Sequence, residues 1–166
     1  DPAVKHVAQE YFTYLDECGE ACKVVIGDGR KKIEQTEDDS FDIIFMDAYS
    51  SDSVPTHLMT REAFEIYFSK LDDDGVLVLN VSNRYLDLEG VVGGLAEEMD
   101  LATRSQLHRV THEQSRKEIY PSNYTIVARD EGDLRGIADH ERWDGTEAEE
   151  LVWTDDYTNI ATIVKC

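Results

Sequence analysis

"FDIIFMDAYSSDSVP", residues 41 to 55, joins two different sequence patterns. Its first half is an apolar run of the length of a buried strand, and its second half collects acids and hydroxyls before Pro55. In open α/β sheets, ligands bind beyond the carboxyl ends of the strands, where loops and helix N-termini meet. We therefore expect the polar side chains after this strand to form part of a binding site.

Helical and strand patterns alternate along the rest of the chain. Apolar runs that predict further strands occur at residues 22–29, 75–83, 102–110 and 123–130. Helical spacing of apolar residues occurs at 4–15, 60–71 and 88–99, with Thr60 as an N-cap and a short helix expected near 30–36. This alternation predicts an α/β domain with a Rossmann-like, mostly parallel sheet and helices on both faces.

The C-terminal residues are patterned differently. Residues 131–150 are acidic and weakly periodic, which predicts an irregular solvated loop, whereas 151–165 are amphipathic enough to dock back as a tail. We expect residues 1–130 to form one Rossmann-like domain and residues 131–166 to be the acidic loop and tail of that same domain.

The charge of the chain is strongly negative. Asp and Glu number 36 against 16 Lys and Arg, a formal net charge of -20, and 41% of the residues are hydrophobic. Such a globular chain repels nucleic acid and anionic membranes and favours small cationic partners. An alternative is that most acids coat the surface for solubility or for high salt, so only acids at strand ends are assigned functional weight.

The cysteines predict a reduced chain without a metal centre. Cys18, Cys22 and Cys166 make neither an even disulfide framework nor a four-ligand metal set, which fits a reduced, cytoplasmic compartment. No apolar run approaches the length of about 18 to 20 residues that crosses a bilayer, and the first residues show no signal-peptide pattern.

Polar residues follow three of the expected strands: Gly27-Asp28-Gly29, Asp47 to Asp52, and Asn80 to Arg84. An acid between two glycines lets a ligand approach the backbone while its carboxylate accepts hydrogen bonds from a base or a ribose. Structural alternatives stay open here. Asp47 could cap a helix or close a turn, Asp52 could belong to a turn, and Tyr120 before Pro121 could be a core residue.

Several motifs in order resemble one family. They read "IGDGRKKI…DDSFDIIFMDAYSSDSVPTHLMTREAFEIYFSKLDDDGVLVLNVSNRYLDL" from residue 26 to residue 88. They are similar to the spermidine synthase-like branch, the polyamine aminopropyltransferases, of the class I S-adenosylmethionine-dependent transferase fold. The likeness spans roughly residues 1–130 and is strongest to soluble domains of members fused to a membrane region, whose tail resembles "VWTDDYTNIATIVK".

The resemblance implies roles for individual residues. Asp28 would bind the adenine of decarboxylated S-adenosylmethionine, and Asp47 would receive the proton of the attacking amine. Asp52 is the nearest match to the acid that holds the diamine, although two extra residues separate it from Asp47. Tyr120, within "IYPSN", would orient the amine. Among their neighbours, Gly29 and Ala48 are expected to line the cofactor site, and Tyr49 is expected to line the amine site.

The chemistry explains why acids are needed. A primary amine with a lysine-like pKa near 10.4 is almost wholly protonated at neutral pH, so about one molecule in a few thousand can attack. A proton acceptor such as Asp47 restores the nucleophile, and further acids attract the dication.

The chain also departs from the family pattern. It begins at a point resembling the end of the family's second strand, so we expect the first two strands, the glycine-rich loop and the ribose-binding acid to be absent. We therefore expect weak cofactor binding, and either direct pairing of residues 22–27 with 41–48 or a homodimer that pairs the open strands. A methyltransferase-like domain and a non-catalytic assembly module are the alternatives.

Overall fold

The computed structural model describes residues 1–48, 55–150 and 152–165. The chain divides into two compact units, Asp1–Thr36 and Glu37–Cys166. No helix in these described ranges is both long and apolar enough to cross a membrane.

The first unit contains three short helices. They are α1 (Pro2–Tyr11), α2 (Tyr14–Cys18) and α3 (Gly29–Glu34). The Asp1 side chain caps α1 by accepting a 2.7 Å hydrogen bond from the Ala3 amide. The expected helix over 4–15 is therefore confirmed up to Tyr11, where Phe12 takes an extended conformation and separates α1 from α2.

The strand predicted for residues 22–29 is wrong. Residues 22–26 belong to no strand, and Gly27, with φ 152°, leads into the N-cap of α3. A strand exists only where a neighbour completes its hydrogen bonds, and within the described residues no ladder includes this segment. Its apolar composition alone does not supply a partner.

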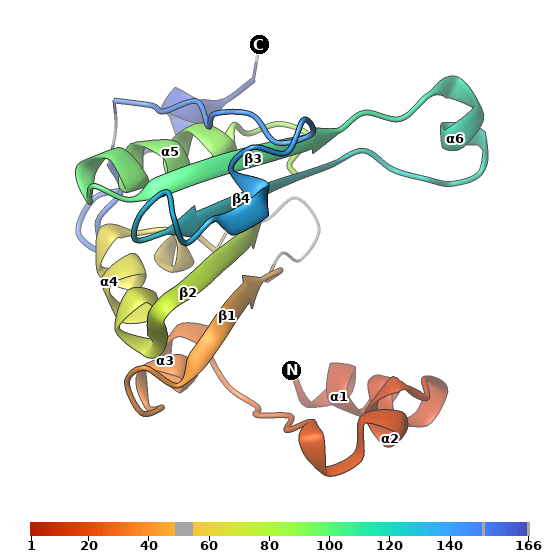
Figure 1. Ribbon diagram of the computed structural model, residues 1–166. Coiled ribbons are helices and arrows are strands. Elements are labelled where there is room, and N and C mark those ends of the chain that lie inside the picture. The colour runs from red at the N-terminus through yellow and green to blue at the C-terminus, as the bar shows by residue number, and fades with distance from the viewer. Residues whose placement is uncertain (49–54, 151, 166) are drawn as a thin grey trace. The chain divides into compact units, whose positions relative to one another are not determined.

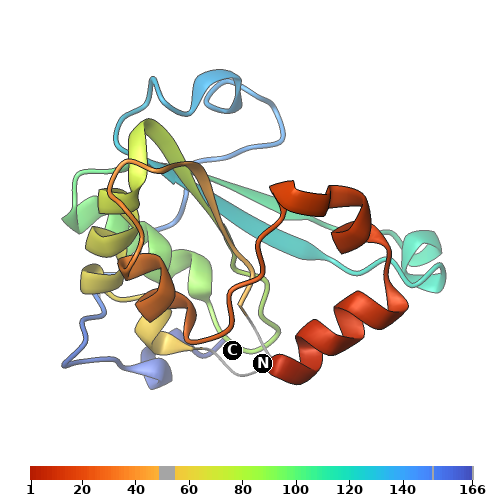
Figure 2. The ribbon, with the colours of Figure 1, turned by 90° about the horizontal axis from the view of Figure 1, so that it is seen from below.

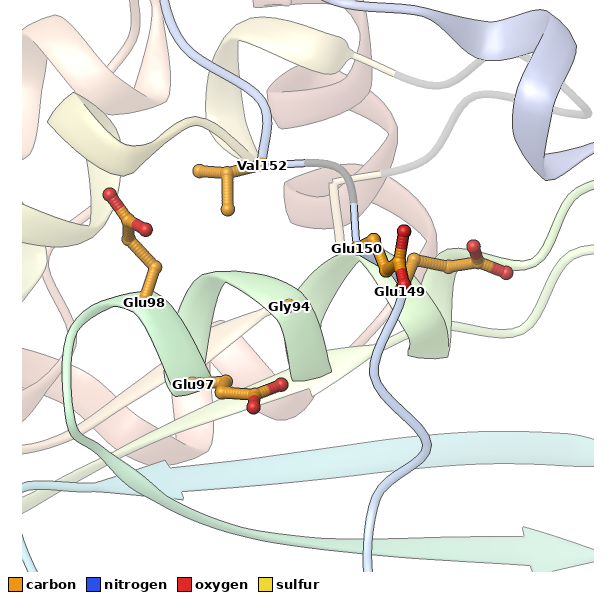
Figure 3. Close-up of a pocket in the computed structure, with 6 residues that line it drawn as sticks. All are labelled: Gly94, Glu97, Glu98, Glu149, Glu150 and Val152. Carbon is orange, nitrogen blue, oxygen red and sulfur yellow. The ribbon is translucent and has the colours of Figure 1, made fainter.

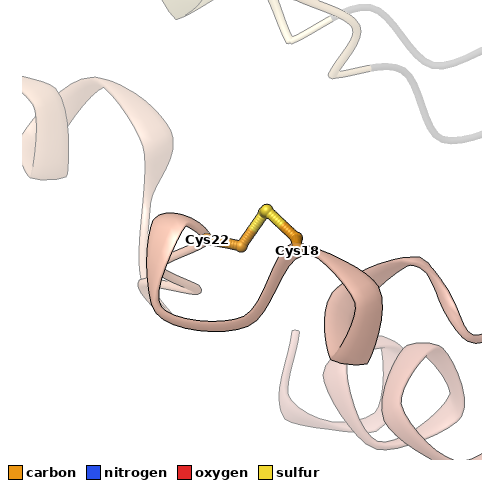
Figure 4. The surroundings of a disulfide bond; sticks show 2 residues. All are labelled: Cys18 and Cys22. Atoms are coloured by element: carbon orange, nitrogen blue, oxygen red, sulfur yellow. A yellow bond between two sulfur atoms is a disulfide. The ribbon is translucent and has the colours of Figure 1, made fainter.

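A disulfide precedes this segment, contrary to the expectation of reduced cysteines. Cys18 ends α2, and the 3₁₀ turn Gly19–Ala21 brings its Cα to 5.5 Å from the Cα of Cys22 (Figure 4). That separation lies within the range that a disulfide requires. The sequence count of three cysteines does not reveal this pairing, because the turn decides it.

The second unit is built on a four-stranded sheet. Its strands are β1 (Phe41–Met46), β2 (Leu71–Asn80), β3 (Ala102–His108) and β4 (Ser122–Ala128), in the order β1-β2-β4-β3 (Figure 1). The α/β class is confirmed. The mostly parallel sheet is not, because β1 and β2 are parallel whereas β4 runs antiparallel to both β2 and β3.

The connections explain this mixed topology. Helix α4 (Arg61–Lys70) joins β1 to β2, and α5 (Leu88–Glu98) joins β2 to β3, so these crossovers keep their strands in one direction. Residues 109–121 instead form an arm that carries the small helix α6 (His112–Arg116) and returns directly into β4 (Figure 1). Without a crossover helix, β4 runs antiparallel to β3.

The two faces of the sheet are covered differently. One face lies against α4 and α5 (Figure 2). Alternate residues of the strands are buried on this face: Ile44, Met46, Leu77, Leu79 and Val127. On the other face, Ile126 and Ala128 pack with Leu134 of the irregular segment after β4. Among the described residues of this unit, helices therefore cover one face, and the predicted loop over 131–150 covers part of the other.

The C-terminal tail docks as predicted. Trp153 is fully buried, and its carbonyl oxygen accepts a 2.8 Å hydrogen bond from the Arg61 amide at the start of α4. The Thr60 hydroxyl caps α4 through the Ala63 amide and donates to the Asp155 carboxylate at 2.8 Å. The tail is thus attached to the N-terminus of α4 by main-chain and side-chain bonds.

Glu62 contributes to this attachment. Burial raises the pKa of its carboxyl, but the amides of Glu62 and Asp155 donate to it and hold its pKa below the usual value overall. A lowered pKa in the folded state stabilises the fold at neutral pH. This contribution is lost as the pH falls through that lowered value.

The glycines of α5 have a packing role. A Cβ placed on Gly93 would clash with the backbone of Glu147, and one on Gly90 would meet the side chain of Glu149. The segment 147–149 therefore lies directly on the helix. The absence of side chains at these positions permits that contact and offsets the low helix propensity of glycine.

Candidate functional site

The structure brings two of the predicted strand ends together. The last register pair of the parallel strands β1 and β2 is Met46 with Leu79, so the next residues, Asp47 and Asn80, lie opposite each other. The Asn80 side-chain Nδ2 donates a 3.0 Å hydrogen bond to Asp47 Oδ1. Two of the polar residues expected at the carboxyl ends of these strands therefore lie in contact, and their functional role stays a prediction.

Strand β4 braces this site from the side. The Val81 amide donates to the Asn123 carbonyl oxygen at 2.9 Å, and the Asn123 amide donates to the Ser82 hydroxyl at 2.8 Å. The Asn123 Nδ2 in turn donates to Glu89 Oε2 at 2.7 Å. Together these bonds fix the residues that follow β2 against the start of β4.

Asp47 is accessible to a ligand. Asp47 and Ala48 are both exposed, and Phe45 in the same strand is 57% exposed beside the Tyr124 ring, with 6.0 Å between ring centroids. The site therefore combines an exposed carboxylate with an apolar and aromatic surface. Such a surface can take the apolar part of a cationic ligand while the carboxylate accepts its N–H groups.

Asp28 and Gly29 lie in the first unit, at the N-terminus of α3. Asp28 Oδ1 accepts a 3.0 Å hydrogen bond from the Lys31 amide, which makes Asp28 the N-cap of that helix. This cap explains locally why an acid precedes the helix. Its role toward adenine stays a prediction.

Of the predicted amine-binding residues, the described ranges include Tyr120. Tyr120 is 76% exposed on the arm, two residues before β4, and the structure shows no hydrogen bond between it and Asp47 in the ranges that it describes. Tyr49 and Asp52 lie outside the described residues. The core position considered for Tyr120 is thus excluded, because its ring is exposed.

A separate hollow of about 460 Å³ lies at the other end of the unit (Figure 3). It is lined by the last turns of α5 and by the segment before the tail, through Gly94, Glu97, Glu98, Glu149, Glu150 and Val152. Since α5 runs back from the carboxyl end of β2, this hollow is not part of the Asp47 site. Over the described residues, no cluster of His, Cys, Asp and Glu has the arrangement of a metal site.

Sequence reasoning missed the contact between Asn80 and Asp47. It placed Asn80 in a polar cluster after a strand, but it assigned the residue no role. The available signal was that both residues directly follow an apolar run, "FDIIFM" and "GVLVL". These equivalent positions showed that the two residues are neighbours only once the register of the parallel strands was known.

The chain is similar to known proteins in sequence. A family model described as "Spermine/spermidine synthase domain" matches residues 1–101. A polyamine aminopropyltransferase of Vibrio vulnificus is 34% identical over 82 residues, which are 48% of this chain and 27% of that protein.

Solved structures show the same fold. The spermidine synthase of Thermotoga maritima superposes with a TM-score of 0.55 at 20% identity, over 86% of this chain and 50% of that one. A probable spermidine synthase of Corynebacterium glutamicum gives a TM-score of 0.57 at 15% identity, over 96% of this chain and 64% of that one. The chain thus spans less than two thirds of each of these relatives. With a family model matched over more than half of its residues, the chain belongs to the spermine/spermidine synthase family.

Proposed function

We propose that this chain contributes to aminopropyl transfer from decarboxylated S-adenosylmethionine to a diamine such as putrescine. The observation that carries this proposal is the exposed Asp47 carboxylate, held by Asn80 at the carboxyl end of β1 in a member of this family. Because the chain spans only part of its relatives' length, the activity is proposed for the natural protein that contains these residues.

The proposed reaction joins the amine nitrogen to the aminopropyl carbon next to the sulfonium. The new C–N bond forms as the C–S bond breaks, and the sulfur keeps that electron pair in methylthioadenosine. The amine becomes reactive by losing a proton, which Asp47 accepts. A carboxylate suits this task, since it only accepts hydrogen bonds and an ammonium group only donates them.

The remaining predicted residues would bind the two substrates. We assign the cofactor to Asp28, Gly29, Asp47 and Ala48, and the diamine to Tyr49, Asp52 and Tyr120. The net charge of -20 supports a cationic substrate, because it raises the local concentration of a dication near the surface.

Detection of methylthioadenosine tests the proposal. The natural protein is incubated with decarboxylated S-adenosylmethionine and putrescine, and both methylthioadenosine and spermidine are quantified. Equal amounts of the two products are expected. Methyl transfer from S-adenosylmethionine without aminopropyl transfer would replace this function by a methyltransferase, and binding of neither nucleoside would favour a non-catalytic module.

We also propose a homodimer that pairs the open edge of β1. Within the described sheet β1 has β2 on one side only, and its Ile43 and Phe45 are 60% and 57% exposed. Apolar edge strands with unpaired main-chain groups favour pairing with another chain.

Light scattering should therefore give twice the monomer mass at micromolar concentration. Ile43→Lys should return the protein to monomer, whereas Ile160→Lys, at a 43% exposed position of the tail, should not. A wild-type monomer at all concentrations would refute the dimer.

A further inference from the structure

We propose that Asn80 is a positioning residue for Asp47, one that holds its carboxylate in the orientation that receives the substrate proton. The inference rests on the proposed function of Asp47. Its starting point is the 3.0 Å hydrogen bond from Asn80 Nδ2 to Asp47 Oδ1. This bond engages one carboxylate oxygen and leaves the other, Oδ2, to receive the amine proton.

The orientation of the Asn80 amide follows from its second contact. The Ser82 backbone N–H lies 3.0 Å from the Asn80 side-chain oxygen, and a backbone N–H can only donate. The atom that it contacts is therefore the acceptor, Oδ1, which leaves the Nδ2 donor facing Asp47. The reverse amide orientation would place two donors against each other at Ser82 and two acceptors against each other at Asp47.

Asn80 is well anchored, whereas Asp47 is not. Asn80 is half-buried at the last position of β2, where it pairs with Tyr124 of β4, and the next amide, that of Val81, donates to Asn123. Asp47 is exposed and follows the last residue of β1. The end of β2, through Asn80, therefore orients the Asp47 side chain, which β1 leaves accessible to solvent.

This orientation matters for the rate. A reacting group must lie within about 3 Å of its partner and in line with it, and a misplacement of about 1 Å can cost roughly 10²-fold in rate. A carboxylate that rotates among several rotamers meets the amine less often in the productive geometry. Loss of Asn80 should therefore lower kcat more than it raises KM.

The isosteric variant Asn80→Asp separates the two contacts of this residue. An oxygen remains to accept from the Ser82 amide, but the donor toward Asp47 is replaced by a second carboxylate oxygen. We expect kcat to fall about 10- to 100-fold, with KM for the nucleoside changed less than about threefold. Asn80→Ala, which adds no charge, should also lower kcat.

Asn159→Asp is the matched control. Asn159 is half-buried, and its Oδ1 accepts from the amide two residues on, Ala161, as Asn80 Oδ1 does from Ser82. The substitution adds the same charge and keeps the same local contact, so turnover should stay within about twofold of wild type. Unchanged kcat in both Asn80 variants would overturn the positioning role.

A ligand-free measurement separates this inference from the proposed function. In a ¹⁵N–¹H spectrum, the side-chain amide resonances of Asn80 should shift in Asp47→Asn and should stay in place in Asp42→Asn, a change at an exposed position of β1. Shifted resonances without any aminopropyl transfer would confirm the contact and reject the function. Resonances that do not respond to Asp47→Asn would reject the contact itself.

Discussion

Substitution of Asp47 by Asn should lower aminopropyl transfer by about 10²- to 10⁴-fold, the usual cost of losing a general base. Asparagine has nearly the same size and keeps an oxygen that accepts from Asn80 Nδ2, so the contact between the ends of β1 and β2 is retained. It cannot accept the amine proton at neutral pH. Turnover is measured as methylthioadenosine formed under saturating substrates.

Asp42→Asn is the control for this change. Asp42 lies in the same strand and is exposed, so the variant removes the same charge from β1 without touching the strand end. Its turnover should remain close to that of the wild type. If Asp47→Asn also keeps wild-type turnover while its thermal transition is unchanged, Asp47 has no part in proton transfer.

Substitution of Trp153 by Ala should lower the free energy of unfolding by about 3–5 kcal/mol, as expected for a large aromatic side chain removed from a core. Trp153 is 0% exposed and lies in the tail beside the N-terminus of α4. Its loss leaves a cavity at the point where the tail is attached. The variant should melt roughly 10–20 °C lower.

Tyr157→Ala provides the comparison, since Tyr157 belongs to the same tail but is 53% exposed. Its cost should stay below about 1 kcal/mol, because an exposed side chain leaves no cavity. Denaturant titrations of both variants measure the difference. Equal stabilities for the two variants would show that the tail is not integrated into the second unit.

Much of the local structure could be predicted from the sequence. The apolar run of residues 41–46 is β1, the Thr60 hydroxyl caps α4 as its position before the helical pattern predicts, and the weakly patterned residues 131–150 are mostly irregular. The docking of the tail followed from its amphipathic pattern. These features depend on side-chain periodicity and capping, which neighbouring residues fix.

The tertiary structure was needed to establish which strands pair and in which direction. Residues 22–26 are as apolar as a strand but form none, and β4 runs antiparallel to its neighbours. It also decided that Asn80 meets Asp47, 33 residues away in sequence. Each of these contacts needs a partner supplied by another segment, and hydrogen bonds between distant segments are not encoded in the periodicity of either one.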